Sequence, residues 1–116
     1  MAIFPSAAIR ALVPVKRLTQ AKLRLAPHLP DAMRQGLAVA MLTDVLDMLS
    51  NAAGLSGTAV VTGDPEIAAL GRRRGARIIH DAEETGTNAA VRCGHKAFAA
   101  EGVAGALVVP ADIPFL

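Results

Sequence analysis

Four cationic side chains follow the first apolar run of the chain. Residues 14–27 read PVKRLTQAKLRLAP and hold Lys16, Arg17, Lys22 and Arg24 with no acidic residue among them. Like charges this close repel one another, so they either splay into water or surround an anion. Arginine binds a phosphate or carboxylate through two parallel N–H groups, and lysine binds as a compact charge. Two interpretations stay open, a solvated basic loop and a phosphate site.

A single carboxylate stands in a rigid segment near the end of the sequence. Asp112 lies in VPADIP, between Pro110 and Pro114, directly after an apolar run. Mg²⁺ in proteins typically takes one or two carboxylates together with substrate phosphates. Asp112 is therefore a candidate Mg²⁺ ligand, and an aspartate that caps a turn is the alternative. Together with the cations it favours phosphoryl or nucleotidyl transfer.

The elements that must position these residues alternate along the chain. Apolar runs predict strands, and i, i+4 apolar spacing or helix start and stop signals predict helices. This alternation predicts an α/β fold of three layers, a Rossmann-like arrangement with a mostly parallel sheet and helices on both faces. Ligands in such folds bind beyond the carboxyl ends of the strands, where both segments above are expected. The expected strands are 9–15, 58–62, 76–80 and 106–109, and the expected helices are 31–53, 65–74 and 88–100.

Local signals give the ends of these helices. Asp31 is expected to cap the first helix, and Gly54 to take the left-handed position after it. Asp64 is expected to cap the second helix, with Pro65 at its first position and Gly75 at its stop. Asp64, in the segment TGDP, could also meet a nucleotide.

The remaining polar residues carry weaker signals. Asn88, in GTNAA, either caps the third helix or reads a base edge. We expect residues 72–74, all arginine, to form a solvated helix end, and the acidic loop of Asp81, Glu83 and Glu84 to be solvated as well. Cys93 is expected to be a small buried residue rather than a nucleophile.

Composition limits the classes of function. The chain has 116 residues, which suggests one domain, with 53% apolar residues, 3% aromatic residues and a net charge of +2. So few aromatic residues argue against a base-stacking nucleic-acid binder. No apolar run reaches the length of a membrane span, and the N-terminus has no signal-peptide pattern. With a single cysteine the chain fits a reducing compartment, so we expect a cytoplasmic protein with no membrane partner, and a homo-oligomer stays open.

The sequence resembles the CofC/FbiD guanylyltransferases that make the deazaflavin coenzyme F-420. The matching segments are VPVKRLTQAKLRLAP, MLTDVLDML, AVVTGDPEIAAL, GTNAAVRCG and VVPADIPFL, in the order of the family. The pattern P-V-K-x-x-x-x-A-K-x-R-L distinguishes this family from molybdenum-cofactor and sugar nucleotidyltransferases, which have a glycine-rich loop there. The resemblance implies a nucleotide-diphospho-sugar-transferase-like (GT-A-like) fold. It also implies transfer of GMP from GTP to 2-phospho-L-lactate, phosphoenolpyruvate or 3-phospho-D-glycerate, with Mg²⁺ as cofactor.

Site residues carry over by matching position. The resemblance assigns the triphosphate to Lys16, Lys22 and Arg24, and Mg²⁺ to Asp112. It places Val13, Pro14, Lys16, Thr62, Asp64, Asn88 and Pro110 at the nucleotide.

Family members are roughly twice as long as this chain. We therefore expect residues 1–116 to be the nucleotide-binding N-terminal portion of one nucleotidyltransferase domain, with strand 106–109 inside the complete sheet. The alternatives are a related GT-A glycosyltransferase, a molybdenum-cofactor nucleotidyltransferase and an inactive nucleotide-binding fragment.

Overall fold

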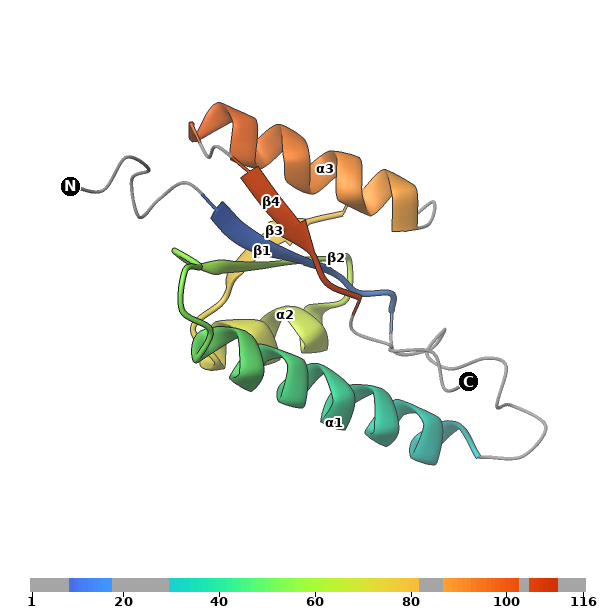
Figure 1. Ribbon diagram of the computed structural model, residues 1–116. Helices are drawn as coiled ribbons and strands as arrows, with labels where there is room; N and C mark the ends of the chain where they lie inside the picture. The colour runs from blue at the N-terminus through green and yellow to red at the C-terminus, as the bar shows by residue number, and fades with distance from the viewer. Residues whose placement is uncertain (1–8, 18–29, 82–86, 103–104, 111–116) are drawn as a thin grey trace.

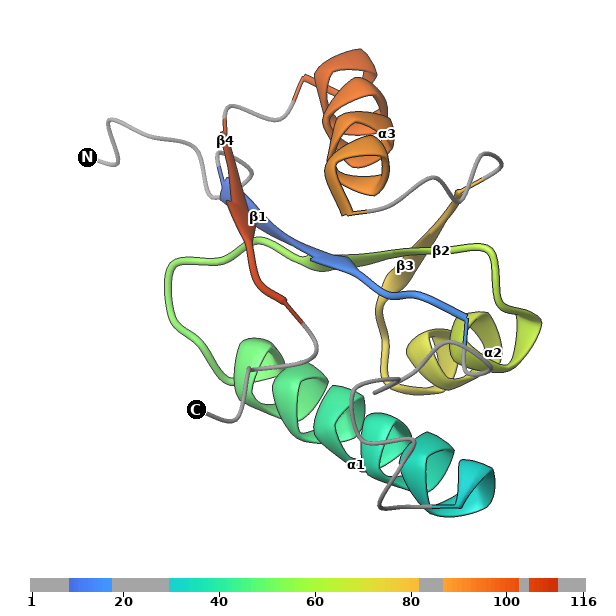
Figure 2. The same cartoon turned by 90° about the vertical axis from the view of Figure 1, so that its right-hand side faces the viewer.

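The computed structural model describes residues 9–17, 30–81, 87–102 and 105–110. These residues form a four-stranded sheet of order β3-β2-β1-β4, in which every neighbouring pair is parallel. Helix α3 covers one face, and α1 and α2 lie on the other (Figures 1 and 2). The predicted three-layer α/β fold is confirmed. The elements are β1 (Ile9–Pro14), α1 (Asp31–Ser50), β2 (Thr58–Thr62), α2 (Pro65–Arg73), β3 (Arg77–His80), α3 (Thr87–Ala100) and β4 (Gly105–Val108).

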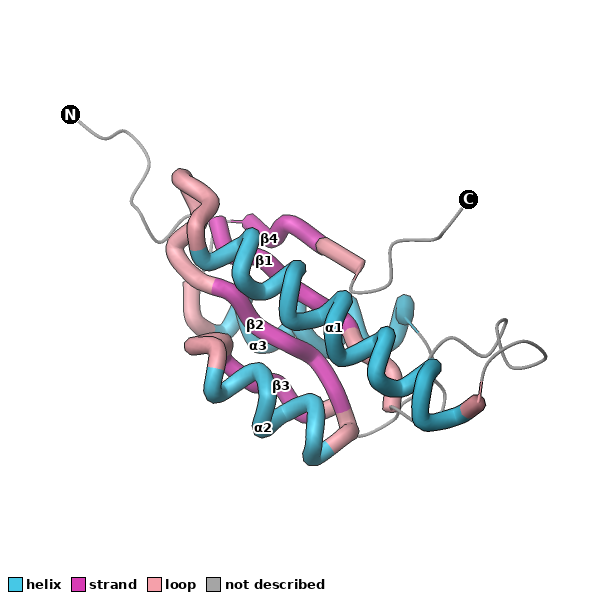
Figure 3. The backbone as a smooth tube through the Cα atoms, turned by 90° about the horizontal axis from the view of Figure 1, so that it is seen from below, coloured by secondary structure: helices cyan, strands magenta, loops and turns pink. Residues whose placement is uncertain are grey.

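The core consists of two layers separated by the sheet. Ala11 and Val13 of β1 face α1 and α2, which lie in front of the sheet in Figure 3, where the molecule is seen from below. Leu12, between them, faces α3 and packs in a cluster with Phe98. All three β1 side chains are fully buried. Strand β1 is thus covered on both faces, as its continuous apolar run predicts.

Helix α2 begins as predicted. The Asp64 side chain accepts hydrogen bonds from the backbone N–H groups of Glu66 and Ile67, and Pro65 takes the first helical position. Gly75 follows the helix with φ of 82°, in the left-handed region that glycine adopts at little cost. The sequence signals for this helix are therefore confirmed at both ends.

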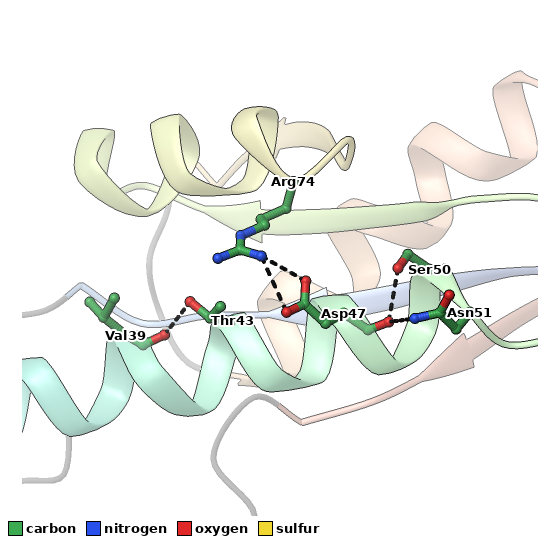
Figure 4. Close-up of polar contacts among 6 residues, drawn as sticks. All are labelled: Val39, Thr43, Asp47, Ser50, Asn51 and Arg74. Atoms are coloured by element: carbon green, nitrogen blue, oxygen red, sulfur yellow. Dashed lines mark hydrogen bonds and ion pairs between the residues drawn. The ribbon is translucent and has the colours of Figure 1, made fainter.

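Helix α1 differs from the prediction at both ends. Its N-cap is Pro30, which makes no side-chain cap bond, so the expected cap at Asp31 is wrong; Asp31 lies inside the first turn and pairs with Arg34. The helix ends at Ser50, three residues before the predicted end at position 53. Ser50 Oγ and Asn51 Nδ2 both donate to the Asp47 carbonyl, at 2.8 and 2.9 Å (Figure 4). These side chains satisfy a terminal carbonyl and stop the helix early.

Gly54, with φ of 92°, is left-handed but lies beyond the helix cap at Asn51. It lies in the loop that leads to β2 and does not occupy the position directly after the cap of α1. The C′ position predicted for it is therefore wrong. Elsewhere the observed ends of strands and helices lie within about one residue of the predicted ones.

Strand β4 is the outermost described strand on its side of the sheet. The Val109 N–H donates to the Leu12 carbonyl at 2.9 Å, on the side of β1. Since neighbouring residues of a strand direct their backbone groups to opposite sides, Val108 directs its N–H and C=O away from β1. Within the described ranges no strand pairs with that side. Leu107 and Val108 are also exposed, by 50% and 39%.

We expect this edge to drive self-association of the 116-residue chain, because an exposed apolar edge without lysine or a bulge is a template for pairing. Val108→Lys should shift the sedimentation profile toward monomer, since a charge on the edge opposes pairing. Met33→Lys is the matched control, because Met33 is exposed but lies in the first turn of α1. A sharp, concentration-independent monomer of the unmodified chain would contradict the prediction.

Gly94 of α3 lies close to the side chain of Leu12 in the sheet. A Cβ added there would lie 2.9 Å from the Leu12 Cγ and closer still to both Leu12 methyl groups. Leu12 is fully buried and cannot move aside freely. Only glycine allows α3 to lie this close to β1.

Gly94→Ala should therefore lower the free energy of unfolding by about 1–3 kcal/mol, the usual cost of overpacking a core. Urea denaturation measures this. Gly36→Ala is the control, because Gly36 lies in α1 with nothing within 4 Å of an added Cβ. That change should stabilise the protein by about 0.5–1 kcal/mol through helix propensity. Equal effects of the two substitutions would be evidence against a close approach at Gly94.

Candidate functional site

The carboxyl ends of the parallel strands form one edge of the sheet, and the predicted site begins there at β1. Val13 is fully buried, and Pro14 ends the strand opposite Val61. The Val15 N–H donates to the Val61 carbonyl at 2.9 Å, so strand pairing continues one residue further. Lys16 follows directly on this fixed backbone, and its side chain is exposed. In the described part of the chain no ion pair involves Lys16.

The end of β2 is organised by hydrogen bonds. Thr62 is 1% exposed, and its Oγ1 accepts the Asp64 N–H at 3.1 Å. Asp64 Oδ1 accepts the Glu66 N–H at 2.8 Å and the Ile67 N–H at 3.4 Å. The helix-cap interpretation of Asp64 is confirmed, and its contact with a nucleotide stays a prediction. Because the Thr62 hydroxyl is buried, its observed role is to hold the turn into α2.

The end of β3 corrects one expectation. Asp81 was predicted to be solvated with its acidic neighbours, but it is only 8% exposed. Its backbone N–H donates to the Thr62 carbonyl at 3.1 Å, which continues the pairing of β3 with β2 past His80. The acidic composition of this loop predicts exposure to solvent, which is wrong for Asp81. The informative signal is position, because Asp81 is the first residue after a strand at the ligand edge.

Helix α3 starts at this same edge. Asn88 lies in its first turn, after Thr87, so it does not take the N-cap position that one interpretation gave it, and its side chain lies outside the described part of the structure. Cys93 is half-buried, and its Sγ donates to the His80 carbonyl at 3.4 Å, so α3 packs beside the end of β3. The cysteine thus has a packing role, as expected, although it is not fully buried.

The structure brings one part of the predicted site together. Because β1, β2, β3 and β4 are parallel, the predicted residues at or just after their carboxyl ends lie at the same edge: Lys16, Thr62, Asp64 and Pro110. Lys22, Arg24 and Asp112 lie outside the described residues. Among the residues that are described, no group of three or more His, Cys, Asp or Glu side chains could hold a metal ion. The Mg²⁺ prediction falls on Asp112 and stays a prediction.

The opposite edge of the sheet has its own cations, and some of these are paired with acids. Arg74, the C-cap of α2, donates to both carboxylate oxygens of Asp47 in α1, at 2.9 and 3.2 Å (Figure 4). Arg74 is exposed, as expected for a solvated helix end, and it also forms an ion pair because α1 passes within reach of it. Arg72 and Arg73 are exposed as expected.

A second group at this edge joins α3 to the sheet. Glu101, just after α3, pairs with Arg10 of β1 at 2.8 Å and with Arg77 of β3. The Arg10 guanidinium also lies 5.9 Å from the centre of the Phe98 ring. These cations hold the layers together.

Comparison with known proteins decides the family. A model described as "Guanylyl transferase CofC like" matches residues 9–116, which is nearly the whole chain. The chain belongs to this CofC guanylyl transferase family. Within the described ranges, this CofC-family chain has no helix long and apolar enough to cross a membrane.

Curated relatives of this CofC-family chain come from several organisms. It is 38% identical over 105 residues to the phosphoenolpyruvate guanylyltransferase of Salinispora arenicola, covering 90% of this chain and 48% of that protein. It is 38% identical over 109 residues to the 3-phospho-D-glycerate guanylyltransferase of Phenylobacterium zucineum, covering 91% and 50%. With the phosphoenolpyruvate guanylyltransferase of Streptomyces avermitilis the identity is 44% over 84 residues, covering 69% and 37%. The chain spans about half the length, or less, of these curated relatives.

Proposed function

We propose that the chain is the nucleotide-binding part of a guanylyltransferase that transfers GMP from GTP to a small phosphorylated acid and releases pyrophosphate. The observation that carries the proposal is the match of residues 9–116 to the family, together with the parallel sheet that sets Lys16 on a fixed backbone at the ligand edge. Names of relatives support phosphoenolpyruvate and 3-phospho-D-glycerate as acceptors. Coenzyme F-420 synthesis, a 2-phospho-L-lactate acceptor and a cytoplasmic location belong to the same proposal.

The proposed transfer depends on positive charge around the phosphates more than on a general base. A phosphate monoester has a second pKa of about 6, so the acceptor oxygen is already mostly ionised at pH 7. Two anions must then be brought together, and cations lower the repulsion between them and stabilise the charge that shifts during transfer.

Lys16 would meet the triphosphate, joined by Lys22 and Arg24 from the same sequence segment. The strand ends carrying Val13, Pro14 and Pro110 would line the nucleotide, near Asp64 and Asn88. Asp112 would hold Mg²⁺, whose contribution when bound is to neutralise phosphate charge. Thr62 would act indirectly, because its buried hydroxyl fixes the backbone of Asp64.

Ligand-induced stabilisation tests the proposed function against its alternatives. Thermal unfolding of the 116-residue chain should shift upward with GTP and Mg²⁺ and much less with sugar nucleotides, since binding to the folded state alone stabilises it. A larger shift with a sugar nucleotide would favour a glycosyltransferase. A chain that responds to no nucleotide would contradict the proposal for this part of the protein.

Lys16→Ala should weaken GTP binding by about 1–3 kcal/mol, the range for a hydrogen bond to a charged group. Isothermal titration calorimetry with GTP measures it. Arg73→Ala is the matched control, because Arg73 is an exposed cation at the opposite edge of the sheet and should leave the affinity unchanged. Unchanged affinity in a folded Lys16→Ala variant would refute the assignment.

Asp112→Asn, made in a chain extended to the length of the relatives, should reduce transfer to below about a tenth of the parent rate at saturating Mg²⁺, given what a metal ion contributes to such reactions. Pyrophosphate release measures the rate. The melting temperature should stay the same, because the segment PADIP contains little that a core needs. Transfer at the parent rate would exclude Asp112 as the metal ligand.

A further inference from the structure

Asp81 is a mostly buried carboxylate at the ligand edge, and it has no role in the transfer proposed above. In β3, Arg77 reaches Glu101 beside α3, and Ile79 packs in the cluster that contains Phe98 of α3. Side chains of a strand alternate between its faces, and the Asp81 N–H continues the pairing with β2. Asp81 therefore lies on the α3 side of the sheet, where it is 8% exposed.

The surroundings of Asp81 suit a negatively charged side chain. In this parallel fold α3 runs back against the strands, so its first turn, from Thr87, lies at the carboxyl edge near Asp81. The N-terminus of a helix carries a partial positive charge. The Cys93 contact with the His80 carbonyl shows that α3 lies against this end of β3. Asp64, by comparison, accepts hydrogen bonds through Oδ1 from the first turn of α2, which lies on the opposite face of the sheet from α3.

The chemistry of guanine matches a carboxylate. An ionised aspartate only accepts hydrogen bonds and offers about four acceptor positions, so a contact with its own chain leaves room for another partner. Guanine has two adjacent donors, N1–H and the exocyclic N2 amine, which one carboxylate can accept together. Adenine has an acceptor at N1, which a carboxylate repels. A hydrogen-bonding site of this kind discriminates strongly, because a mismatched base leaves a buried polar group without its partner.

We propose that Asp81 selects guanine, accepting hydrogen bonds from N1–H and N2 of the base of GTP on the α3 side of the sheet. This inference rests on the proposed function, since it names the residue by which the same nucleotide site chooses its base. It assigns the triphosphate to the cations after β1 and the base to the end of β3. The two ends of the nucleotide would then be held by different strands of one sheet.

Binding of four nucleotides, without an acceptor, tests the proposal. The unmodified chain should bind GTP at least about tenfold more tightly than ITP, which lacks the N2 amine, and also more tightly than XTP or ATP, as expected for a hydrogen bond to a charged acceptor. Asp81→Asn should remove the preference for GTP over ITP. It should also raise the affinity for XTP relative to GTP, because the asparagine amide can donate to the 2-oxo group of xanthine. A gain for XTP cannot come from a merely structural role.

Glu66→Gln is the matched control, because it removes one negative charge in the first turn of α2, at the same edge, and should leave base preference unchanged. A folded Asp81→Asn variant that keeps the original preference would overturn the proposal. If that variant does not fold, the unmodified chain still decides, since equal affinity for GTP and ITP would also overturn it. An unmodified chain that binds none of the nucleotides would overturn the proposed function, and the inference with it.

Discussion

Burial of β1 on every side is the constraint on which the remaining structure depends. The strand pairs with β2 and β4, and its side chains Ala11, Leu12 and Val13 have no solvent exposure. A strand buried on both faces needs a cover on each, so α3 and the α1–α2 pair are both required. Helix α3 can pack this closely against β1 only because Gly94 has no side chain at the position that the Leu12 side chain occupies. The same rigid strand then fixes the backbone that presents Lys16.

Much of this fold could be predicted from sequence because its signals are local. Continuous apolar runs gave β1 and β2, and the order Asp64, Pro65 and Gly75 gave α2 with its cap and stop. The start of α1 could not be predicted from such local signals. Asp31 has the right side chain for a cap, but Pro30 takes that position and Arg34 takes the carboxylate. A helix-capping preference describes one residue at a time, so it does not show which neighbouring group will bind the carboxylate.

The site was predicted less fully than the fold, because burial and pairing arise from distant parts of the chain. Asp81 belongs to an acidic segment in sequence, yet pairing of its backbone with Thr62 places it at the edge of the sheet, where it is buried. Arg74 belongs to a cationic helix end, yet Asp47, far away in sequence, binds it. Lys16 was placed correctly because its position depends only on the end of β1. The roles assigned to Lys22, Arg24 and Asp112 still rest on sequence alone.

The helix ends at the carboxyl edge have a consequence for how an anion approaches the protein. At the amino edge, Arg72 and Arg73 are exposed in addition to the arginines that Glu101 and Asp47 bind. At the other edge Lys16 is exposed, and α1, α2 and α3 all direct their N-termini to that side. Because cationic side chains lie at both edges, side-chain charge alone would not direct an anion to the carboxyl edge. The partial charge of the helix ends belongs to the backbone, so it acts within the first turn and does not titrate. An anion would be oriented there at short range, by an attraction that stays constant with pH for as long as the fold is intact.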